Sequence, residues 1–420
     1  MRLIRWLGFM VVMGQGAICS NAASGVNEAS LRNISLTSKV TKVQPMTGLV
    51  LWTDNNAVAT ESIQLEYSYM RYDDVIVGPG MYDWTNIDQL LSQIATRGHQ
   101  AVLRFYFVYP GKVSSVPAYI KALTDYDETK GKSEGKETTF CDWSNTTLQK
   151  AIVDFYTEFA KRYDRDARLA FLQTGFGLWS EYHIYDGPMT LGKTFPDANY
   201  QTAFVKHLSS TFQNTPWSVS VDAASEEWSP LATNSSLKRL LFGLFDDSFL
   251  CKQHARINVK NWAAFGSDRW KSSPAGGELS YYNQRDQKFA LSDKGPNGIR
   301  FEDSAKQFHI SYMIADGQPK YQSMERIKEA SMALGYRFRV TKFQSSDGAS
   351  QVTIRNEGVA PLYHDAFVSV DGVRTTSSLK GLLPGEEKRY LVDAGSSEPK
   401  LKIESDRLVR GQEIQFDADL

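Results

Sequence analysis

Short apolar runs of strand type alternate with helical periodicity over most of the chain. Eight runs predict buried strands: 47–52, 62–69, 101–108, the run from Ala170 to Glu181, 217–222, 241–247, the run that contains Glu278, and 307–312. Helical spacing of apolar residues occurs from Thr85 to the stop at Gly98, and at 149–163, 199–213 and 323–334. This alternation favours a parallel sheet, and eight strands predict an α/β fold, a (β/α)8 TIM barrel over 46–335.

The pattern changes after Gly335. Short alternating strands follow at 336–340, 351–354, 366–370 and 400–403, separated by turns rich in Gly, Pro, Asn and Ser, without helical periodicity. This texture predicts a small C-terminal β-sandwich over 336–420.

The N-terminus has the pattern of an export signal. A positively charged start and a short apolar run, followed by small residues, predict a signal peptide over 1–22 with cleavage near Ala22, and hence a secreted or periplasmic protein. A membrane anchor is the less favoured alternative, because the run is too short and no later run approaches about 18 apolar residues. Lipid attachment at Cys19 is a second alternative, disfavoured by the bulky Ile18 before it. Residues 23–45, polar and aperiodic, are expected to be a leader or linker.

Composition narrows the choice of ligand. Lys and Arg (47) balance Asp and Glu (48), and no basic stripe occurs, so we expect no nucleic-acid partner. The six histidines are scattered, without a His or Cys pair at ligand spacing, so we expect no metal and no other cofactor. Cys141 and Cys251 are expected on opposite sides of the barrel and therefore unbridged.

Two glutamates carry the candidate chemistry. Glu181 follows a Gly- and Trp-bearing strand end, and Glu278 follows two glycines, on the fourth and seventh expected strands. Strands four and seven face each other across a barrel mouth, which suits the two carboxyl groups that glycoside hydrolysis requires. Trp179 and Tyr182 should raise the pKa of Glu181 and make it the acid/base, whereas Glu278 should stay ionised and act as the nucleophile.

Other side chains expected near the mouth suit sugar binding. We expect substrate contacts from Arg104, Trp179, Tyr182, His183, Trp228, Asp246, Asp247, Tyr281 and His309. Arg104, Asp246 and Asp247 either bind sugar hydroxyls or form a structural ion pair. Aromatic rings could stack on sugar faces. Trp228 and the further candidates Tyr185, Trp262 and Trp270 could each equally belong to the core.

The motif from Gly177 to His183 (Gly-Leu-Trp-Ser-Glu-Tyr-His), with Gly-Gly-Glu278 downstream and a C-terminal sandwich, resembles the bacterial DUF4832 family. That family is similar to the clan A (β/α)8 glycoside hydrolases. The resemblance implies a barrel with carboxylates after strands four and seven, which map onto Glu181 and Glu278. The chain departs from the pattern at Ser180 and Tyr182, where the family usually has Gly and Trp, and clan A enzymes usually have Asn at the position of Ser180.

The leading hypothesis is a retaining glycoside hydrolase that acts on a poly- or oligosaccharide. The alternative is a non-catalytic carbohydrate-binding protein that uses the barrel mouth, and a separation of the Glu181 and Glu278 carboxyl groups well beyond 10 Å would favour it. A serine hydrolase is disfavoured, because the chain has no Gly-x-Ser-x-Gly elbow.

Overall fold

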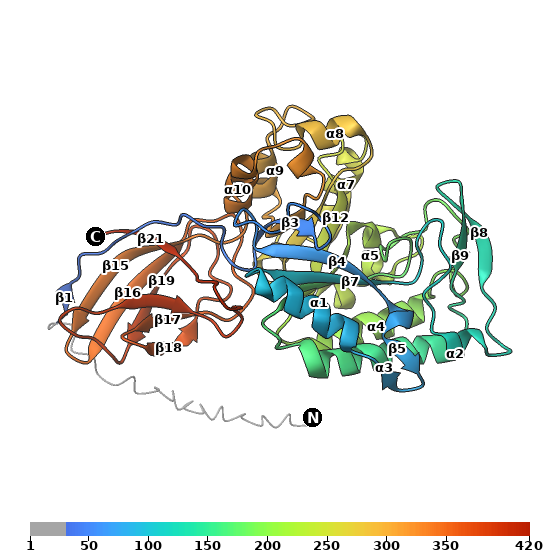
Figure 1. Cartoon of the computed structure of the whole chain (residues 1–420), viewed down its shortest axis with the longest axis horizontal. Helices are drawn as coiled ribbons and strands as arrows, with labels where there is room; N and C mark the ends of the chain where they lie inside the picture. Colours follow the sequence, from blue (N-terminus) through green and yellow to red (C-terminus); the bar gives the residue numbers. More distant parts are fainter. Residues whose placement is uncertain (1–30) are drawn as a thin grey trace, which may run out of the picture.

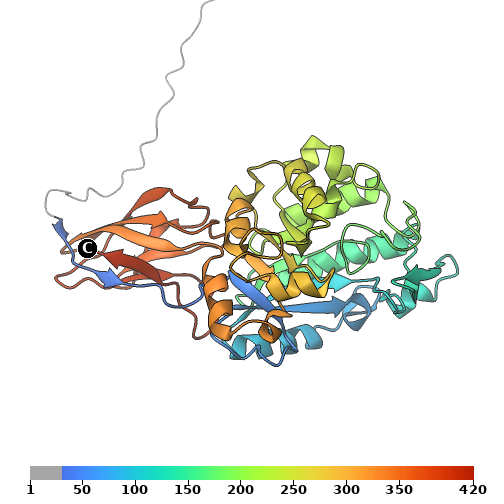
Figure 2. The same cartoon turned by 90° about the horizontal axis from the view of Figure 1, so that it is seen from above.

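A closed parallel barrel packs against a smaller group of antiparallel sheets in the computed structural model, which describes residues 31–420 (Figures 1 and 2). The barrel strands in chain order are β3 (Gly48–Trp52), β4 (Leu65–Arg71), β7 (Gln100–Tyr106), β10 (Leu169–Gln173), β11 (Trp217–Ser220), β12 (Gly243–Phe249), β13 (Ala275–Leu279) and β14 (Tyr312–Ile314). Each pairs in parallel with the next, and β14 closes the ring on β3. The predicted (β/α)8 barrel is therefore confirmed. The predicted signal peptide lies outside the described residues.

Helices pack around the barrel between consecutive strands. They are α1 (Thr85–Thr96), α2 (Ala118–Lys121), α3 (Thr146–Tyr163), α4 (Ala198–Thr211), α5 (Pro230–Thr233), α6 (Ser235–Lys238), α7 (Ala255–Ala264), α8 (Gln284–Phe289), α9 (Phe301–Gln307) and α10 (Met324–Met332). In α3, the Asn145 side chain caps the first turn by accepting the Leu148 N–H at 3.0 Å. Phe155 and Phe159, four residues apart on its buried face, pack against Phe105 of β7. Capping and one apolar face thus explain why this segment is helical and where it docks.

Two hairpins extend the loops that follow the strands. They are β5 (Ile76–Gly78) with β6 (Met81–Tyr82), and β8 (Thr129–Ser133) with β9 (Lys136–Phe140). β8 and β9 project from the end of the barrel that is remote from the antiparallel sheets (Figure 1). This is the end at which the strands terminate, where barrel enzymes have their active sites.

Two strand boundaries differ from expectation. The eighth strand was expected over 307–312, but Gln307 ends α9 and β14 begins at Tyr312. The fourth strand was expected to run to Glu181, but β10 ends at Gln173. Short apolar runs do not separate strand from helix end or tight loop, which explains both errors.

Large side chains fill the barrel interior, and one of them, Tyr312, leaves room only for a glycine beside it. Tyr312 stacks on Phe171 at 4.6 Å between ring centroids, and Gln173 donates to the Tyr312 hydroxyl at 3.0 Å. A Cβ at Gly276 would lie 2.5 Å from the Tyr312 ring, so only glycine fits there. Gly276 therefore faces inward, and alternation along β13 turns Glu278 inward as well.

The C-terminal part consists of two antiparallel layers. Its strands are β15 (Phe338–Ser346), β16 (Ala349–Asn356), β17 (Phe367–Val370), β18 (Val373–Ser378), β19 (Glu387–Val392), β20 (Leu401–Glu404) and β21 (Phe416–Asp419). β18, β17 and β20 form one sheet, and β19, β16, β15 and β21 belong to the other. This second sheet also contains β1 (Arg32–Asn33), paired with β15, and β2 (Thr37–Ser38), paired with β21. Within the expected leader or linker over 23–45, residues 32–33 and 37–38 are therefore paired into this sheet.

The antiparallel part covers the lower end of the barrel, which is the end where the parallel strands begin. One apolar cluster joins Val102 and Phe171 of the barrel to Phe338 and Ile354 of the sandwich. Arg407, which is buried, donates to the Asp164 and Leu169 carbonyls at 3.1 and 2.7 Å and to the Thr215 hydroxyl at 3.0 Å. Shared core and buried polar contacts make this a fixed interface and not a flexible tether.

Cys141 and Cys251 are both buried and unpaired, as expected. Within residues 31–420, no helix has the length and apolar character needed to cross a membrane.

Candidate active site

Glu181 is positioned by a folded-back loop and not by a strand. After β10, the backbone N–H groups of Phe176 and Gly177 both donate to the Glu181 carbonyl, at 3.1 and 2.9 Å. The turn that makes this possible places Trp179 and Ser180 at φ +54° and +60°, where non-glycine residues are uncommon. Backbone strain of this kind is concentrated at functional sites, so the loop is a candidate part of the active site.

The small residues of the motif are needed for this loop to close. A Cβ at Gly177 would lie 1.8 Å from the His183 carbonyl oxygen, and one at Gly175 would lie 2.3 Å from that of Ser180. The buried Ser180 hydroxyl accepts from the Gly175 N–H at 3.2 Å and donates to the Gly175 carbonyl at 2.9 Å. Ser180 therefore stabilises the loop from within, at the position where clan A enzymes usually carry Asn.

Arg104 of β7 organises the interior of the mouth. Its guanidinium donates to both Asp247 carboxylate oxygens, at 3.0 and 3.1 Å, and to the side-chain oxygen Oε1 of Gln173 at 2.9 Å. It also donates to the Trp179 carbonyl at 3.2 Å, which ties the loop to the barrel. The nearby guanidinium outweighs burial and lowers the pKa of Asp247. Asp247 is thus the ionised carboxylate of the group.

Glu181 lies between His183 and Asp247. The Glu181 Oε2 atom is 2.6 Å from His183 Nε2, and its carboxyl group shares a hydrogen bond with Asp247. The Tyr185 N–H points at His183 Nδ1 from 3.5 Å, which leaves the ring proton on Nε2, directed at Glu181. Burial and then the Asp247 charge raise the pKa of Glu181 well above its ordinary value. The direction agrees with expectation, but the main causes are burial and Asp247.

Glu278 faces the same interior from β13. Burial, followed by the Asp247 charge, raises the pKa of Glu278 to about 8, although Arg104 opposes the rise. The expectation that Glu278 stays ionised is therefore wrong for the substrate-free protein at neutral pH. The reason is that its chain neighbours are small, so the sequence did not reveal the desolvation and the Asp247 charge that act on Glu278.

One donor set in the mouth suits a metal ion. Glu181, His183 and Asp222 offer three ligand atoms within 4.8 Å of one another. Glu181 and His183 are already hydrogen-bonded to each other, so an ion would have to break that bond. Asp222 lies in the turn after β11 and was not identified from the sequence.

Three of the expected substrate-binding residues face away from the mouth. Side chains alternate along a strand, so Asp246 points outward where its neighbour Asp247 points inward. The Asp246 carboxylate accepts from the Ser248 N–H at 2.9 Å and from Asn258 Nδ2 at 2.8 Å. Tyr182 is buried outside the barrel, and its carbonyl accepts from Trp228 Nε1 at 2.8 Å. Tyr182 and Trp228 therefore pack the shell around the barrel and do not reach the mouth.

His309 and Trp270 lie at the opposite end of the barrel. Their rings stack at 3.5 Å between centroids, and His309 Nδ1 is 2.7 Å from the Val359 carbonyl oxygen. The sequence placed His309 wrongly because the strand boundary was wrong. His309 precedes β14 and does not lie at its C-terminal end. Trp262 packs against the outer core, with its Nε1 atom 3.4 Å from Asp246 Oδ2.

The structure adds aromatic residues that sequence reasoning missed. Arg104 lies against the rings of Phe245, at 4.2 Å, and Tyr69, at 5.5 Å. Tyr69 also contacts the rings of Trp52 and Tyr109, at 5.3 and 6.0 Å. Tyrosines at alternate positions of one strand, as at 67 and 69, were the available signal that aromatic side chains share its inward face.

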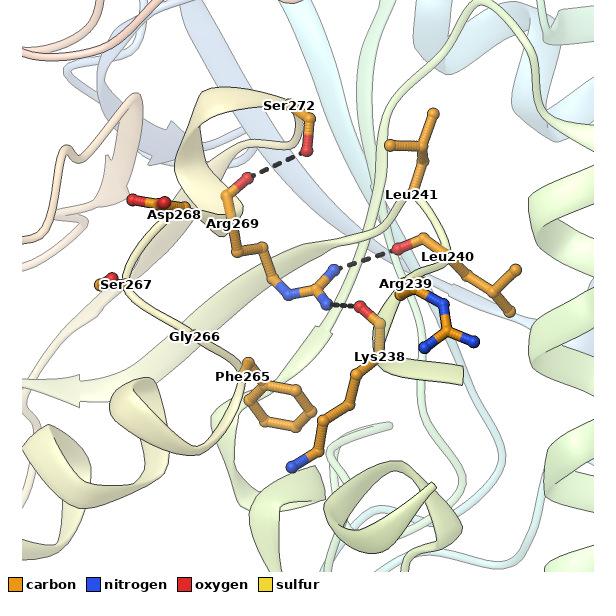
Figure 3. Close-up of a pocket in the computed structure, with 10 residues that line it drawn as sticks. All are labelled: Lys238, Arg239, Leu240, Leu241, Phe265, Gly266, Ser267, Asp268, Arg269 and Ser272. Atoms are coloured by element: carbon orange, nitrogen blue, oxygen red, sulfur yellow. Dashed lines mark hydrogen bonds between the residues drawn. The ribbon is translucent and has the colours of Figure 1, made fainter. Parts of the chain in front are cut away.

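Two cavities lie away from these carboxyl groups. A cavity of about 300 Å³ is lined by segments that precede β12 and β13. In it, Arg269 donates to the Leu240 carbonyl at 3.1 Å and to the Lys238 carbonyl (Figure 3). A second cavity, of about 320 Å³, lies between the lower end of the barrel and the sandwich, beside His364 and Arg407. Both are remote from the ends of the strands where catalysis occurs in barrels.

Similarity to known proteins is found among solved structures, and it is low. No protein-family model matches the chain, and no curated protein sequence matches it, so the likeness to DUF4832 rests on the motifs alone. Among solved structures, the catalytic domain of β-amylase from Paenibacillus polymyxa matches with a TM-score of 0.42 and 11% identity, over 70% of this chain and 99% of that one. The α-galactosidase TtGalA from Thermus thermophilus matches with a TM-score of 0.41 and 14% identity, over 72% and 64%. Tryptophan synthase from M. tuberculosis matches with a TM-score of 0.32 and 12% identity, over 68% and 90%.

Proposed function

We propose that the protein is a retaining glycoside hydrolase that acts on a poly- or oligosaccharide, with Glu181 as acid/base and Glu278 as nucleophile. The observation that carries the proposal is the arrangement around Asp247. This one ionised carboxylate raises the pKa of both glutamates. Glu181 lies in the loop after the fourth strand, and Glu278 lies on the seventh strand. Both glutamates therefore lie near it, at the end of the barrel where catalysis occurs.

The proposed reaction has two steps. In the first, Glu181 gives its proton to the glycosidic oxygen while the Glu278 carboxylate bonds to the anomeric carbon, and the leaving sugar departs as an alcohol. In the second, Glu181 removes a proton from water, whose oxygen attacks the same carbon and releases Glu278. Glu278 must lose its own proton before it attacks, so its raised pKa favours a reaction at alkaline pH.

Asp247 and Arg104 have supporting roles in this proposal. Both Asp247 oxygens are committed to Arg104, which makes Asp247 a poor nucleophile. Its fixed charge keeps Glu181 protonated and stabilises the positive charge that develops on the sugar in the transition state. Arg104 holds Asp247 and the Trp179 carbonyl, so it positions the acid loop relative to the barrel.

A non-catalytic carbohydrate-binding protein is the second candidate. The observation that favours it is the raised pKa of Glu278, which leaves this carboxyl group neutral at pH 7 and able to donate a hydrogen bond to a sugar hydroxyl. The position of Ser180 inside its loop also leaves no amide before Glu181 for a substrate hydroxyl.

We further propose that residues 1–22 direct export and that the protein is secreted or periplasmic, with 46–335 as the catalytic domain and 336–420 as its sandwich. The support is the charged and apolar pattern of the N-terminus. N-terminal sequencing of protein recovered from the periplasm or the medium should begin near residue 23.

The function is tested with the full chain and a panel of aryl glycosides and natural plant, algal and bacterial glycans at pH 6–9. Cleavage should be found, and NMR of the first product should show the anomeric configuration of the substrate. Inversion would contradict the two-step mechanism. Binding without cleavage of any substrate would favour the carbohydrate-binding protein.

A further inference from the structure

Exposed aromatic side chains flank the carboxyl groups of the mouth. Tyr185 is 66% exposed, and Tyr281 and Tyr282 are 51% and 60% exposed. Large aromatic side chains at the surface have no role in the core, and when they gather beside a polar site they indicate a binding surface.

The first group lies beside Glu181. The Tyr185 ring lies 4.5 Å from the ring of His183 and 6.0 Å from the ring of Trp179, measured between centroids. His183 is the residue that is hydrogen-bonded to Glu181. The Trp179 ring is 6.4 Å from that of Tyr109. We name Tyr109, Trp179 and Tyr185 the first platform. It runs without a break from the proposed acid to the surface.

The second group lies beside Glu278. Tyr281 and Tyr282 follow β13 directly, and we name them the second platform. The Tyr281 hydroxyl accepts from the Gly317 N–H at 3.0 Å, and the Tyr282 ring is 4.9 Å from that of His254. The rings are therefore held in place although they are exposed.

The topology places the two platforms at separate positions around the mouth. The loop after β10 carries the first platform's Tyr185, and β13 leads into the second; β11 and β12 lie between these strands in the ring of eight. Asp247 of β12 lies between them along the ring, with Glu181 beside the first platform and Glu278 beside the second. A ligand that contacts both platforms therefore passes beside the proposed catalytic pair.

We propose that the mouth binds a glycan chain whose sugar units stack on both platforms, so that the enzyme cleaves the chain internally. This inference rests on the proposed function of the same site. Tyr and Trp rings bind the apolar faces of sugars while their polar edges remain hydrated. Exposed platforms on both sides suit a chain that continues in both directions better than a single terminal sugar, which would be enclosed.

The test uses the full chain in three assays. First, a Glu278→Gln variant, which binds without cleaving, is applied to an array of oligosaccharides from one to eight units. Second, calorimetry measures its affinity for each length of the strongest series. Third, mass spectrometry identifies the products that the wild type forms from the longest member, labelled at the reducing end with ¹⁸O.

The inference predicts that affinity rises with length, and that both products of the first cut contain two or more units. Tyr185→Ala and Tyr281→Ala should each weaken binding of the longest chain about tenfold, as loss of one stacked ring implies. Tyr185→Phe should retain most of the affinity. Leu391→Ala, an exposed apolar change on the sandwich, is the control and should have no effect.

The outcomes separate the two proposals. Affinity that does not depend on length, release of single sugars only, or unchanged binding in both alanine variants would overturn the inference and leave the hydrolase standing. Length-dependent binding that both alanine variants weaken, without cleavage by the wild type, would overturn the hydrolase and retain the platforms as a binding surface for chains. Failure to bind any glycan would overturn both.

Discussion

Arg104 holds both carboxylate oxygens of Asp247, at 3.0 and 3.1 Å, inside the barrel mouth. The pair fixes a negative charge at a point that both Glu181 and Glu278 sense. Protons are therefore retained on the two glutamates and not on Asp247. This unequal distribution of protons among three carboxyl groups determines most of the behaviour expected of the site.

Loss of either glutamate should have a distinct kinetic signature. Glu278→Ala should abolish turnover of every substrate, and azide should restore some activity by forming a glycosyl azide of inverted configuration. Glu181→Ala should reduce cleavage of natural linkages about 10²–10⁴-fold, while aryl glycosides with acidic phenols still form the glycosyl-enzyme. Steady-state and burst kinetics measure both effects. Glu227→Ala, an exposed glutamate that follows β11, is the matched control. Equal losses on all substrates without azide rescue would contradict the retaining mechanism.

The pH dependence should show an acid limb near pH 8. Glu278 must be ionised to attack and its pKa is about 8, so kcat/KM should rise with pH up to that value. Asp247→Asn removes a charge that raises this pKa, so the limb should move to lower pH in the variant. Rate profiles between pH 5 and 10 measure the shift, with thermal denaturation to monitor folding. A wild-type limb below pH 6 would show that Glu278 is already ionised in the free enzyme.

Protonation of Glu278 also links stability to pH. Its pKa is raised from an ordinary 4.5 to about 8 in the folded chain, so the folded state binds this proton more tightly than the unfolded state. The resulting stability is present below pH 4.5 and is lost as pH rises to 8. Glu278→Gln has no proton to lose, so it should match the wild type near pH 4.5 and be more stable at pH 9, by roughly 2–4 kcal/mol. Denaturant unfolding at both values tests this. A stability difference that is constant with pH would contradict the raised pKa.

The sandwich should be needed for a stable barrel. Arg407→Met leaves three oxygen acceptors of the barrel's lower end without their donor, which should cost roughly 2–4 kcal/mol. Deletion of residues 336–420 exposes the shared core and should leave an insoluble or unstable protein. Denaturant unfolding measures the first, and solubility and melting temperature the second. Arg410→Met, an exposed change three residues away, should be neutral. A truncated chain that melts with the full-length protein would show independent domains.

Thiol titration should find two free cysteines in protein that lacks residues 1–22. Cys141 and Cys251 are buried and unpaired, so they should react fully in denaturant without reduction and slowly in the folded state. The absence of free thiols in the unfolded monomer would contradict the structure.

The barrel was accessible from the sequence because strand and helix periods alternate regularly. The position of Glu278 was accessible for the same reason, since alternation along a strand determines which face each side chain occupies. Asp246 and Asp247 show the limit of this argument, because a shift of one residue exchanges the inner and outer faces. The sequence alone placed both aspartates at the mouth, but in the structure only Asp247 lies there.

The location of Glu181 depended on information that no local pattern contains. Its loop is fixed by contacts to Arg104 of β7 and to the Val108 carbonyl just beyond β7, a segment far away in the chain. The pKa values of the carboxyl groups likewise depend on enclosure by many elements. Sequence spacing therefore singled out Glu181 as a candidate and gave the direction of its pKa shift, but it gave neither the backbone setting of Glu181 nor the Asp247 charge that acts on it.

The pairing of β2 with β21 brings Thr37 beside Asp419, from opposite ends of the described chain. A ribosome makes the first of these residues long before the last. The sheet that supports the lower end of the barrel therefore cannot form completely until β21 has been synthesised, because β2 and β15 both pair with it. Until then, their unpaired edges must be protected from aggregation.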